Sequence, residues 1–70
     1  MSKVKQLREE ANLKQEFFAE MLDVSPANYS KKENGLIKYT LAEAKTIADF
    51  FGKSIEEVFF ADEVSKNETL

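Results

Sequence analysis

The chain has 70 residues, with 10 Lys and Arg against 13 Asp and Glu, and its net charge is −3 at pH 7. It contains no Cys, His or Trp, which excludes disulfides, thiolate nucleophiles, sulfur-ligated zinc and a histidine general base. A single short domain has little room for a catalytic cleft, so we expect no enzymatic activity, no metal and no other cofactor.

The first two predicted elements are short amphipathic helices. Apolar residues recur at helical spacing over residues 4–11, and Asn12, which tolerates the left-handed conformation, ends this helix. A second apolar stripe covers residues 18–22, and residues 23–25 break it. No alternating run of four or more residues predicts a strand.

A third helix is predicted from Pro26 to about Asn34. Ser25 is suited to be its N-cap, because a hydroxyl oxygen accepts hydrogen bonds from the first free backbone amides. Proline starts a helix well, since its missing N–H has no partner there in any case. Gly35 then closes the helix.

Two capping boxes open the last two predicted helices. Thr40 and Glu43 begin the fourth helix, which Gly52 stops, and Ser54 and Glu57 begin a short fifth helix. The apolar faces comprise Leu41, Ala44, Ile47, Ala48 and Phe51 in the fourth helix and Ile55, Val58 and Phe59 in the fifth.

These elements predict one all-α domain over residues 1–60, followed by a short, acidic and flexible tail over residues 61–70. The longest apolar run covers residues 58–61, far short of the roughly 20 residues that a membrane-spanning helix needs. No secretory signal is recognisable near the N-terminus. We therefore expect a cytoplasmic protein that does not contact membranes.

Charge is distributed unevenly along the chain. Residues 1–40 hold seven basic and six acidic side chains, whereas residues 41–70 hold three and seven. The acidic overall balance is untypical of nucleic-acid binders. Any polyanionic partner is therefore expected to meet the first half of the chain.

Residues 15–35 have the spacing of a helix-turn-helix unit. Two helices of about eight residues are separated by a three-residue turn, which is the geometry of that motif. Ala19 falls where the helices cross, and its small side chain permits close approach. Val24 is expected to plug the turn, and Tyr29 to pack back from the second of these helices.

In these features the chain resembles the Cro/lambda-repressor-like (XRE) helix-turn-helix family. The resemblance covers residues 4–60 and implies a compact five-helix fold with the motif at the second and third helices. The matching positions are Leu7, Arg8, Glu9, Leu13, Lys14, Gln15, Phe18, Ala19, residues 22–25, Glu33, Asn34, Gly35, Leu41, Ala44, Ile47, Ala48 and residues 54–59.

The resemblance implies that the third helix is a recognition helix, whose N-terminal part enters the major groove of double-stranded DNA. Lys31 is suited to hydrogen bonding with guanine and Asn28 to adenine or a phosphate, while Ala27 offers a methyl group to thymine. Removal of the Lys31 side chain is expected to relax the preference at one base pair.

Further positions are implied to hold the DNA backbone without reading sequence. Gln15 matches a position that usually grips a phosphate, and the backbone amides near Asn34 and Gly35 would act with Lys38. The predicted DNA-binding residues are Gln15, Ser25, Pro26, Ala27, Asn28, Ser30, Lys31, Asn34 and Lys38.

Arg8 and Glu33 occupy positions that form a largely buried ion pair in the family. The resemblance therefore implies that this pair ties the first helix to the third. The alternative is two exposed charges that contribute little to stability.

Several residues depart from the family pattern. Asp23 stands where the turn usually carries Gly, and Lys14 replaces the usual hydroxyl cap of the second helix. Lys32 occupies a position that is normally apolar, where its stem is expected to pack while its charge reaches solvent. Leu36 and Ile37 stand where basic residues are common, which weakens the expected grip on phosphate.

The six Phe residues are many for a chain of this length. Phe50 and Phe60 fall outside the expected core positions, and we predict that they form a two-fold dimer patch with the junction of the fourth and fifth helices. The alternative is that each ring covers an edge of the core.

Two function classes follow. The first is a transcription regulator, a small repressor that binds a palindromic operator as a homodimer and associates with the nucleoid when bound to DNA. The second is a protein-interaction module on the same fold, antitoxin-like or regulator-binding, with weak DNA binding. No small-molecule ligand is expected in either case.

Overall fold

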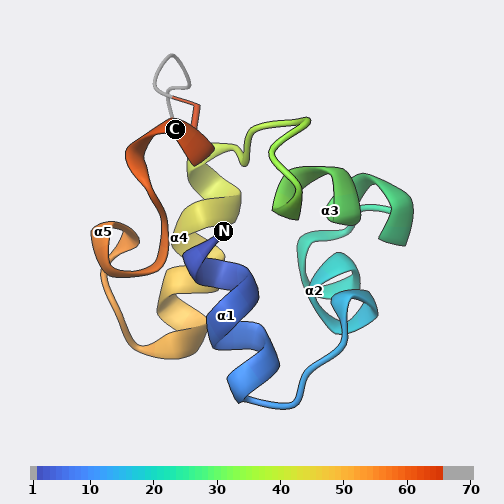
Figure 1. Ribbon diagram of the computed structural model, residues 1–70, viewed down its shortest axis with the longest axis horizontal. Coiled ribbons are helices and arrows are strands. Elements are labelled where there is room, and N and C mark those ends of the chain that lie inside the picture. Colours follow the sequence, from blue (N-terminus) through green and yellow to red (C-terminus); the bar gives the residue numbers. More distant parts are fainter. Residues whose placement is uncertain (1, 66–70) are drawn as a thin grey trace.

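The computed structural model describes residues 2–65, which form an all-α structure (Figure 1). Its helices are α1 (Lys3–Glu10), α2 (Gln15–Leu22), α3 (Pro26–Glu33), α4 (Leu41–Phe51) and α5 (Ile55–Val58), followed by a short 3₁₀ helix, η1 (Ala61–Glu63). The predicted all-α, five-helix fold is therefore confirmed. Among the described residues, none of these helices is long and apolar enough to cross a membrane.

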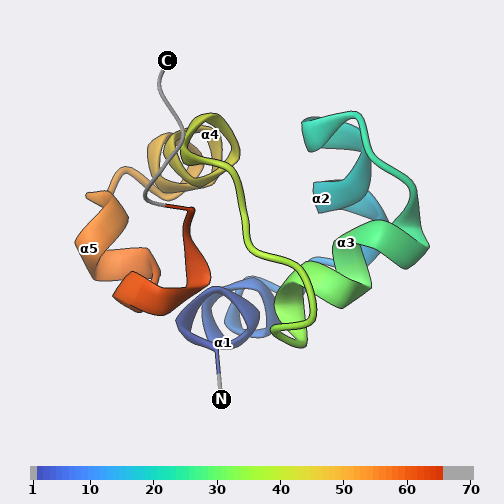
Figure 2. The same ribbon diagram turned by 90° about the horizontal axis from the view of Figure 1, so that it is seen from above.

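The helices are arranged in three groups. Seen from two directions, α1 and α4 lie in the middle, the α2–α3 pair lies on one side and α5 lies on the other (Figures 1 and 2). The α2–α3 pair is therefore covered from one side only, and its outer surface is open to a partner.

Local hydrogen bonds explain where the helices begin. Ser25 Oγ accepts the N–H of Asn28 at 3.1 Å, as predicted for an N-cap. The capping boxes of α4 and α5 are both present, with the side chains of Thr40 and Ser54 at their N-caps. Lys14 makes no side-chain capping bond at the start of α2, as its departure from the family pattern implied.

The core is built around aromatic rings. Phe18 is fully buried and meets Tyr29 edge-on, with ring centroids 5.8 Å apart. Tyr39, in the connection between α3 and α4, is also fully buried. Its ring centroid lies 4.8 Å from that of Phe59. The buried apolar residues are Val4, Phe18, Ala19, Tyr29, Tyr39, Ala44, Ile47, Ala48, Val58, Phe59 and Val64.

The ordered domain extends past residue 60. Val64 is buried and forms an isolated parallel bridge with Tyr39. The N–H of Tyr39 donates to the carbonyl of Glu63 at 2.8 Å, and the N–H of Ser65 donates to the carbonyl of Tyr39 at 2.9 Å. The expectation of a flexible tail thus does not hold for residues 61–65, and residues 66–70 lie outside the described residues.

Candidate nucleic-acid interface

The α2–turn–α3 unit is held by a tight turn over residues 23–25. Asp23 adopts the left-handed conformation, with φ 58° and ψ 44°. Its N–H donates to Glu20 O at 3.1 Å, and the N–H of Val24 donates to Ala19 O at 3.0 Å. Because Ala19 is buried and small, α2 and α3 pack closely, as predicted.

The outer surface of α3 carries no exposed acidic side chain. Its only acidic residue, Glu33, is buried. The exposed residues of the helix are Pro26, Ala27, Asn28 and Lys31, and Ser30 is half-buried. Lys31 forms no ion pair within residues 2–65. This surface therefore combines one free cation with small uncharged groups.

Glu33 lies at the centre of a buried polar network. Arg8 contacts its carboxylate with two nitrogens, Nε to Oε2 at 2.7 Å and Nη2 to Oε1 at 3.1 Å. Gln15 Nε2 donates to Oε1 at 3.0 Å, and the Tyr29 hydroxyl donates to Oε2 at 2.8 Å. The Tyr39 hydroxyl donates in turn to that of Tyr29 at 3.4 Å.

These hydrogen bonds decide the charge state of the network. Burial works to raise the pKa of Glu33, but hydrogen bonds from Arg8, Gln15 and Tyr29 outweigh it and place the pKa below its ordinary value. The hydrogen bond to Glu33 raises the pKa of Arg8. Glu33 and Arg8 are therefore both ionised at neutral pH.

The pairing of Arg8 with Glu33 was predicted from sequence, but the three other members of the network, Gln15, Tyr29 and Tyr39, were not predicted to join it. Tyr29 was expected to pack back from the second helix of the motif, and its spacing of four residues from Glu33 already favours contact on one helix face. No local pattern brings the Tyr39 hydroxyl to Tyr29, since the two residues belong to different elements.

The backbone amides after α3 are not free to bind phosphate. The N–H groups of Asn34, Gly35, Leu36 and Ile37 donate to carbonyls of α3 at 3.0, 3.2, 2.9 and 3.3 Å. The prediction of an amide grip near Asn34 and Gly35 is therefore wrong, because these donors close the C-terminal end of the helix. The Asn34 side chain remains exposed.

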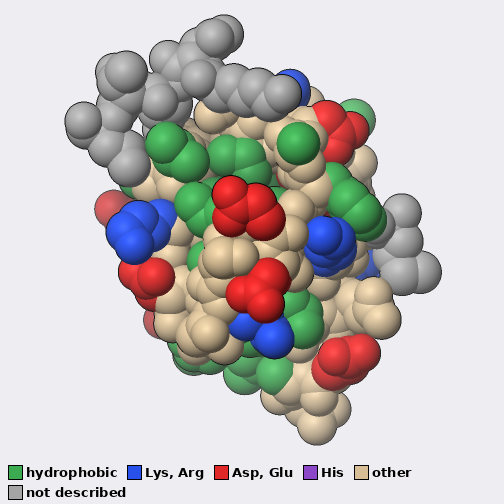
Figure 3. Space-filling model, turned by 90° about the vertical axis from the view of Figure 1, so that its left-hand side faces the viewer, with side chains coloured by type: hydrophobic (Ala, Val, Ile, Leu, Met, Phe, Trp, Pro, Cys, Tyr) green, Lys and Arg blue, Asp and Glu red, His purple; other side chains and the backbone are tan. Residues whose placement is uncertain are grey.

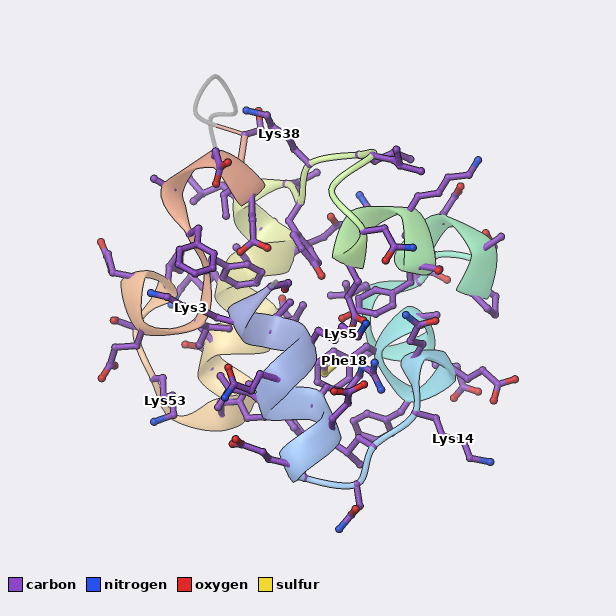
Figure 4. All side chains as sticks on the ribbon, viewed as in Figure 1. Lys3, Lys5, Lys14, Phe18, Lys38 and Lys53 are labelled. Atoms are coloured by element: carbon purple, nitrogen blue, oxygen red, sulfur yellow. The ribbon has the colours of Figure 1, made fainter. Side chains whose placement is uncertain are left out.

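Lys38 lies apart from the start of the recognition helix. Figure 4 shows it near the beginning of α4 and the end of the described chain, whereas Lys14 projects from the opposite end of the α2–α3 side. The structure thus groups the α3 residues on one surface and leaves Lys38 at its margin.

Lys32 is anchored rather than extended into solvent. Its ammonium group lies 3.0 Å from Glu43 Oε1 and donates to the carbonyl of Lys38 at 3.3 Å. The expectation that this charge reaches solvent is wrong, because Glu43 at the first turn of α4 supplies a nearby counter-charge. The contact connects the end of α3 to the start of α4.

Phe50 and Phe60 contact different helices. Phe50 is 44% exposed and packs against Phe17 of α2, with ring centroids 5.5 Å apart. Phe60 is 46% exposed and lies under the ammonium group of Lys3, which is 4.8 Å from its ring centroid. Phe50 thus contacts α2 and Phe60 lies beside α1, and the dimer patch that contains both rings stays a prediction.

Phe60 borders an apolar groove of about 580 Å³. Figure 3 shows the side of the molecule that carries α5, where hydrophobic side chains reach the surface between charged ones. The residues lining the groove are Lys3, Leu41, Ile55, Glu56, Phe59, Phe60, Ala61, Val64 and Ser65.

The chain matches one family of known proteins. A family model described as helix-turn-helix covers residues 4–58, from α1 through α5. Comparisons with curated proteins and with solved structures find no match. The matched region includes the whole α2–turn–α3 unit and the residues of the Glu33 network.

Proposed function

Since the chain belongs to the Cro/lambda-repressor-like helix-turn-helix family, which indicates a DNA-binding transcription regulator, we propose that it is a sequence-specific repressor. In this proposal α3 enters the major groove of double-stranded DNA, and its exposed residues read the base edges. Lys31 donates to guanine, Asn28 bonds adenine or a phosphate, and Ala27 contacts a thymine methyl group.

The observation that carries the proposal is the charge of the α3 surface. The chain has a net charge of −3, yet no exposed acidic side chain lies on this helix, because Glu33 is buried against Arg8. A phosphate backbone approaching α3 therefore meets Lys31 and uncharged groups on this helix, and the exposed acidic residues of the motif, Glu16, Glu20 and Asp23, lie on α2 and in the turn.

Contacts to the DNA backbone are proposed on both sides of α3. Gln15 at the start of α2 and Ser25 at the start of α3 offer polar side chains. Asn34 and Lys38 offer exposed side chains beyond the end of α3. These contacts fix the register of the protein on the duplex without specifying sequence.

A homodimer on a palindromic operator is the proposed assembly. Phe60 is a half-exposed ring beside an apolar groove, and a two-fold interface requires such mutually complementary features on one surface. Two copies on DNA would contact half-sites about 34 Å apart, one helical turn.

The test measures affinity for duplex DNA over a range of salt concentrations. Lys31→Ala is expected to lower affinity and relax the preference at one base pair, at a cost of about 1–3 kcal/mol. Lys53→Ala is the matched control, since it removes the same charge from the far side of the molecule (Figure 4). Equal losses in both variants, or none in either, would contradict the proposed base reading.

The second candidate function is a protein-interaction module. It is favoured by Leu36, which is 76% exposed, and by the adjoining rings of Phe17 and Phe50. DNA binding loses affinity steeply as salt rises, because it releases counterions. A salt-insensitive association with a protein that is lost on Phe17→Ser would support this second function.

A further inference from the structure

Gln15 is the predicted DNA contact that is joined directly to the buried network. Its Nε2 donates to Glu33 Oε1 at 3.0 Å, and that same oxygen accepts from Arg8 Nη2 at 3.1 Å. The side chain of Glu33 is 0% exposed, whereas Gln15 is only partly buried. Gln15 thus lies between the interior of the domain and its surface.

The chemistry of a primary amide suits this position. Nε2 carries two hydrogens, and the bond to Glu33 uses one of them. The second hydrogen is left for another acceptor. A Lys at this position would pair with Glu33, and a Glu would be repelled by it, so an uncharged group with two donors is the side chain that can bridge two anions.

Arg8 makes the approach of a second anion possible. Its bidentate contact compensates the charge of Glu33, with Nε 2.7 Å from Oε2. The negative charge behind Gln15 is therefore balanced within the protein. A phosphate that accepts the remaining Nε2 hydrogen does not face an uncompensated carboxylate.

From this geometry we infer that Glu33 is a positioning residue for DNA binding, which fixes the Gln15 amide so that its second N–H is directed to a backbone phosphate. The inference rests on the proposed function. It assigns the buried pair a role beyond stability, because the Arg8–Glu33 contact and the orientation of Gln15 share the same carboxylate oxygen.

The first test uses the unmodified chain, labelled with ¹⁵N, and a short random-sequence DNA duplex at low salt. In the free protein one Nε2 proton of Gln15 is expected to exchange slowly with solvent, as a proton bonded to Glu33. On adding DNA the other proton should shift. Gln6 is the internal control, since its Nε2 contacts only Glu10 on the exposed face of α1.

The outcomes separate this inference from the proposed function. If backbone amides of α3 shift with DNA while both Gln15 protons stay unchanged or shift alike, the inference is wrong and the function stands. If no amide of α3 shifts, DNA binding by this surface fails, and the inference fails with it.

A second test distinguishes positioning from stability. Affinity is measured for a series of duplexes, each with one phosphate replaced by a neutral methylphosphonate. Gln15→Leu should weaken binding to the unmodified duplex by about tenfold. The wild type should show the same loss on one duplex of the series, the one in which the phosphate contacted by Gln15 is replaced. Gln15→Leu should lose no further affinity on that duplex. Glu33→Asp keeps the charge but withdraws the carboxylate by one methylene. This variant should therefore bind the unmodified duplex and the duplex with that methylphosphonate with equal affinity. If folded Glu33→Asp loses affinity at the same modified phosphate as the wild type and to the same extent, the inference is wrong.

Discussion

Glu33 accepts four hydrogen bonds from three side chains in the interior of the domain. A buried ion pair is not itself strong evidence of net stability, but removing one member leaves the other buried and unpaired. The single carboxylate thereby joins α1, α2 and α3.

Glu33→Gln should therefore lower the free energy of unfolding by about 3–5 kcal/mol, because Arg8 would remain buried without its counter-charge. Urea denaturation measures the loss. Glu20→Gln is the control, since Glu20 is exposed on α2 and its replacement should change stability by less than about 0.5 kcal/mol. Equal stability of Glu33→Gln and the wild type would mean that the pair contributes nothing.

The two tyrosines predict the behaviour of the domain at high pH. Burial raises the pKa of both Tyr29 and Tyr39 above the ordinary value. In the unfolded chain they ionise near pH 10, so their contribution to stability is fully present below that pH and is lost as pH rises above it. Since the chain has two Tyr and no Trp, tyrosinate absorbance reports both residues directly.

We expect no tyrosinate signal in the folded protein up to about pH 10, followed by a cooperative increase in step with loss of helical circular dichroism. An ordinary titration centred near pH 10 while the helical signal persists would show that the two hydroxyls are accessible to solvent.

At the scale of elements, the turn between α2 and α3 depends on one backbone conformation. Asp23 has φ 58°, where a side chain with a Cβ is strained. Asp23→Gly should stabilise the domain by up to about 1 kcal/mol, and Asp23→Val should destabilise it by about 1–2 kcal/mol.

Asp49→Gly is the control for Asp23→Gly, because it should change the free energy of unfolding in the opposite direction. Asp49 lies within α4, where Asp49→Gly should cost about 0.5 kcal/mol through lost helix propensity. Thermal unfolding of the variants compares the two positions. Stabilisation at both positions, or an unaffected Asp23→Val, would contradict this account of the turn.

The helix boundaries could be predicted from sequence because their signals are local. Ser25 and the two capping boxes act within three residues along the chain, and Gly52 ends α4 in the left-handed conformation. Such hydrogen bonds depend on neighbouring residues and hardly on the rest of the fold.

The parts that sequence did not predict depend on contacts between distant segments. Val64 bridges Tyr39, 25 positions away in the chain, and Lys32 finds its counter-charge on α4. Phe50 packs against Phe17 of α2. In each case the partner belongs to another element, and no local sequence pattern specifies how the two elements pack. The contacts of these residues could therefore not be predicted from the sequence.

At the scale of the whole molecule, two different surfaces lie on opposite sides. The α2–α3 pair carries the proposed DNA-binding residues, and the side of α5 carries Phe60 and its groove (Figure 1). Separate surfaces allow one copy to bind DNA and a second copy at the same time.

Sedimentation tests the proposed dimer with and without DNA. The wild type is expected to dimerise at high concentration, and Phe60→Ser should weaken the dimer by removing an exposed ring beside the groove. Phe17→Ser is the matched control, because Phe17 is similarly exposed, at 44%, but belongs to α2 and packs against Phe50 of α4. A wild type that stays monomeric under both conditions, or equal effects of the two variants, would contradict the proposed dimer.

Selection from a randomised duplex pool at low salt tests whether the protein binds double-stranded DNA in a sequence-specific manner. We expect enrichment of an inverted repeat whose half-sites lie about one helical turn, 34 Å, apart. Lys31→Ala should relax the preference at one base pair of each half-site, and Lys53→Ala should retain it. A recovered pool that remains random would contradict base reading by α3.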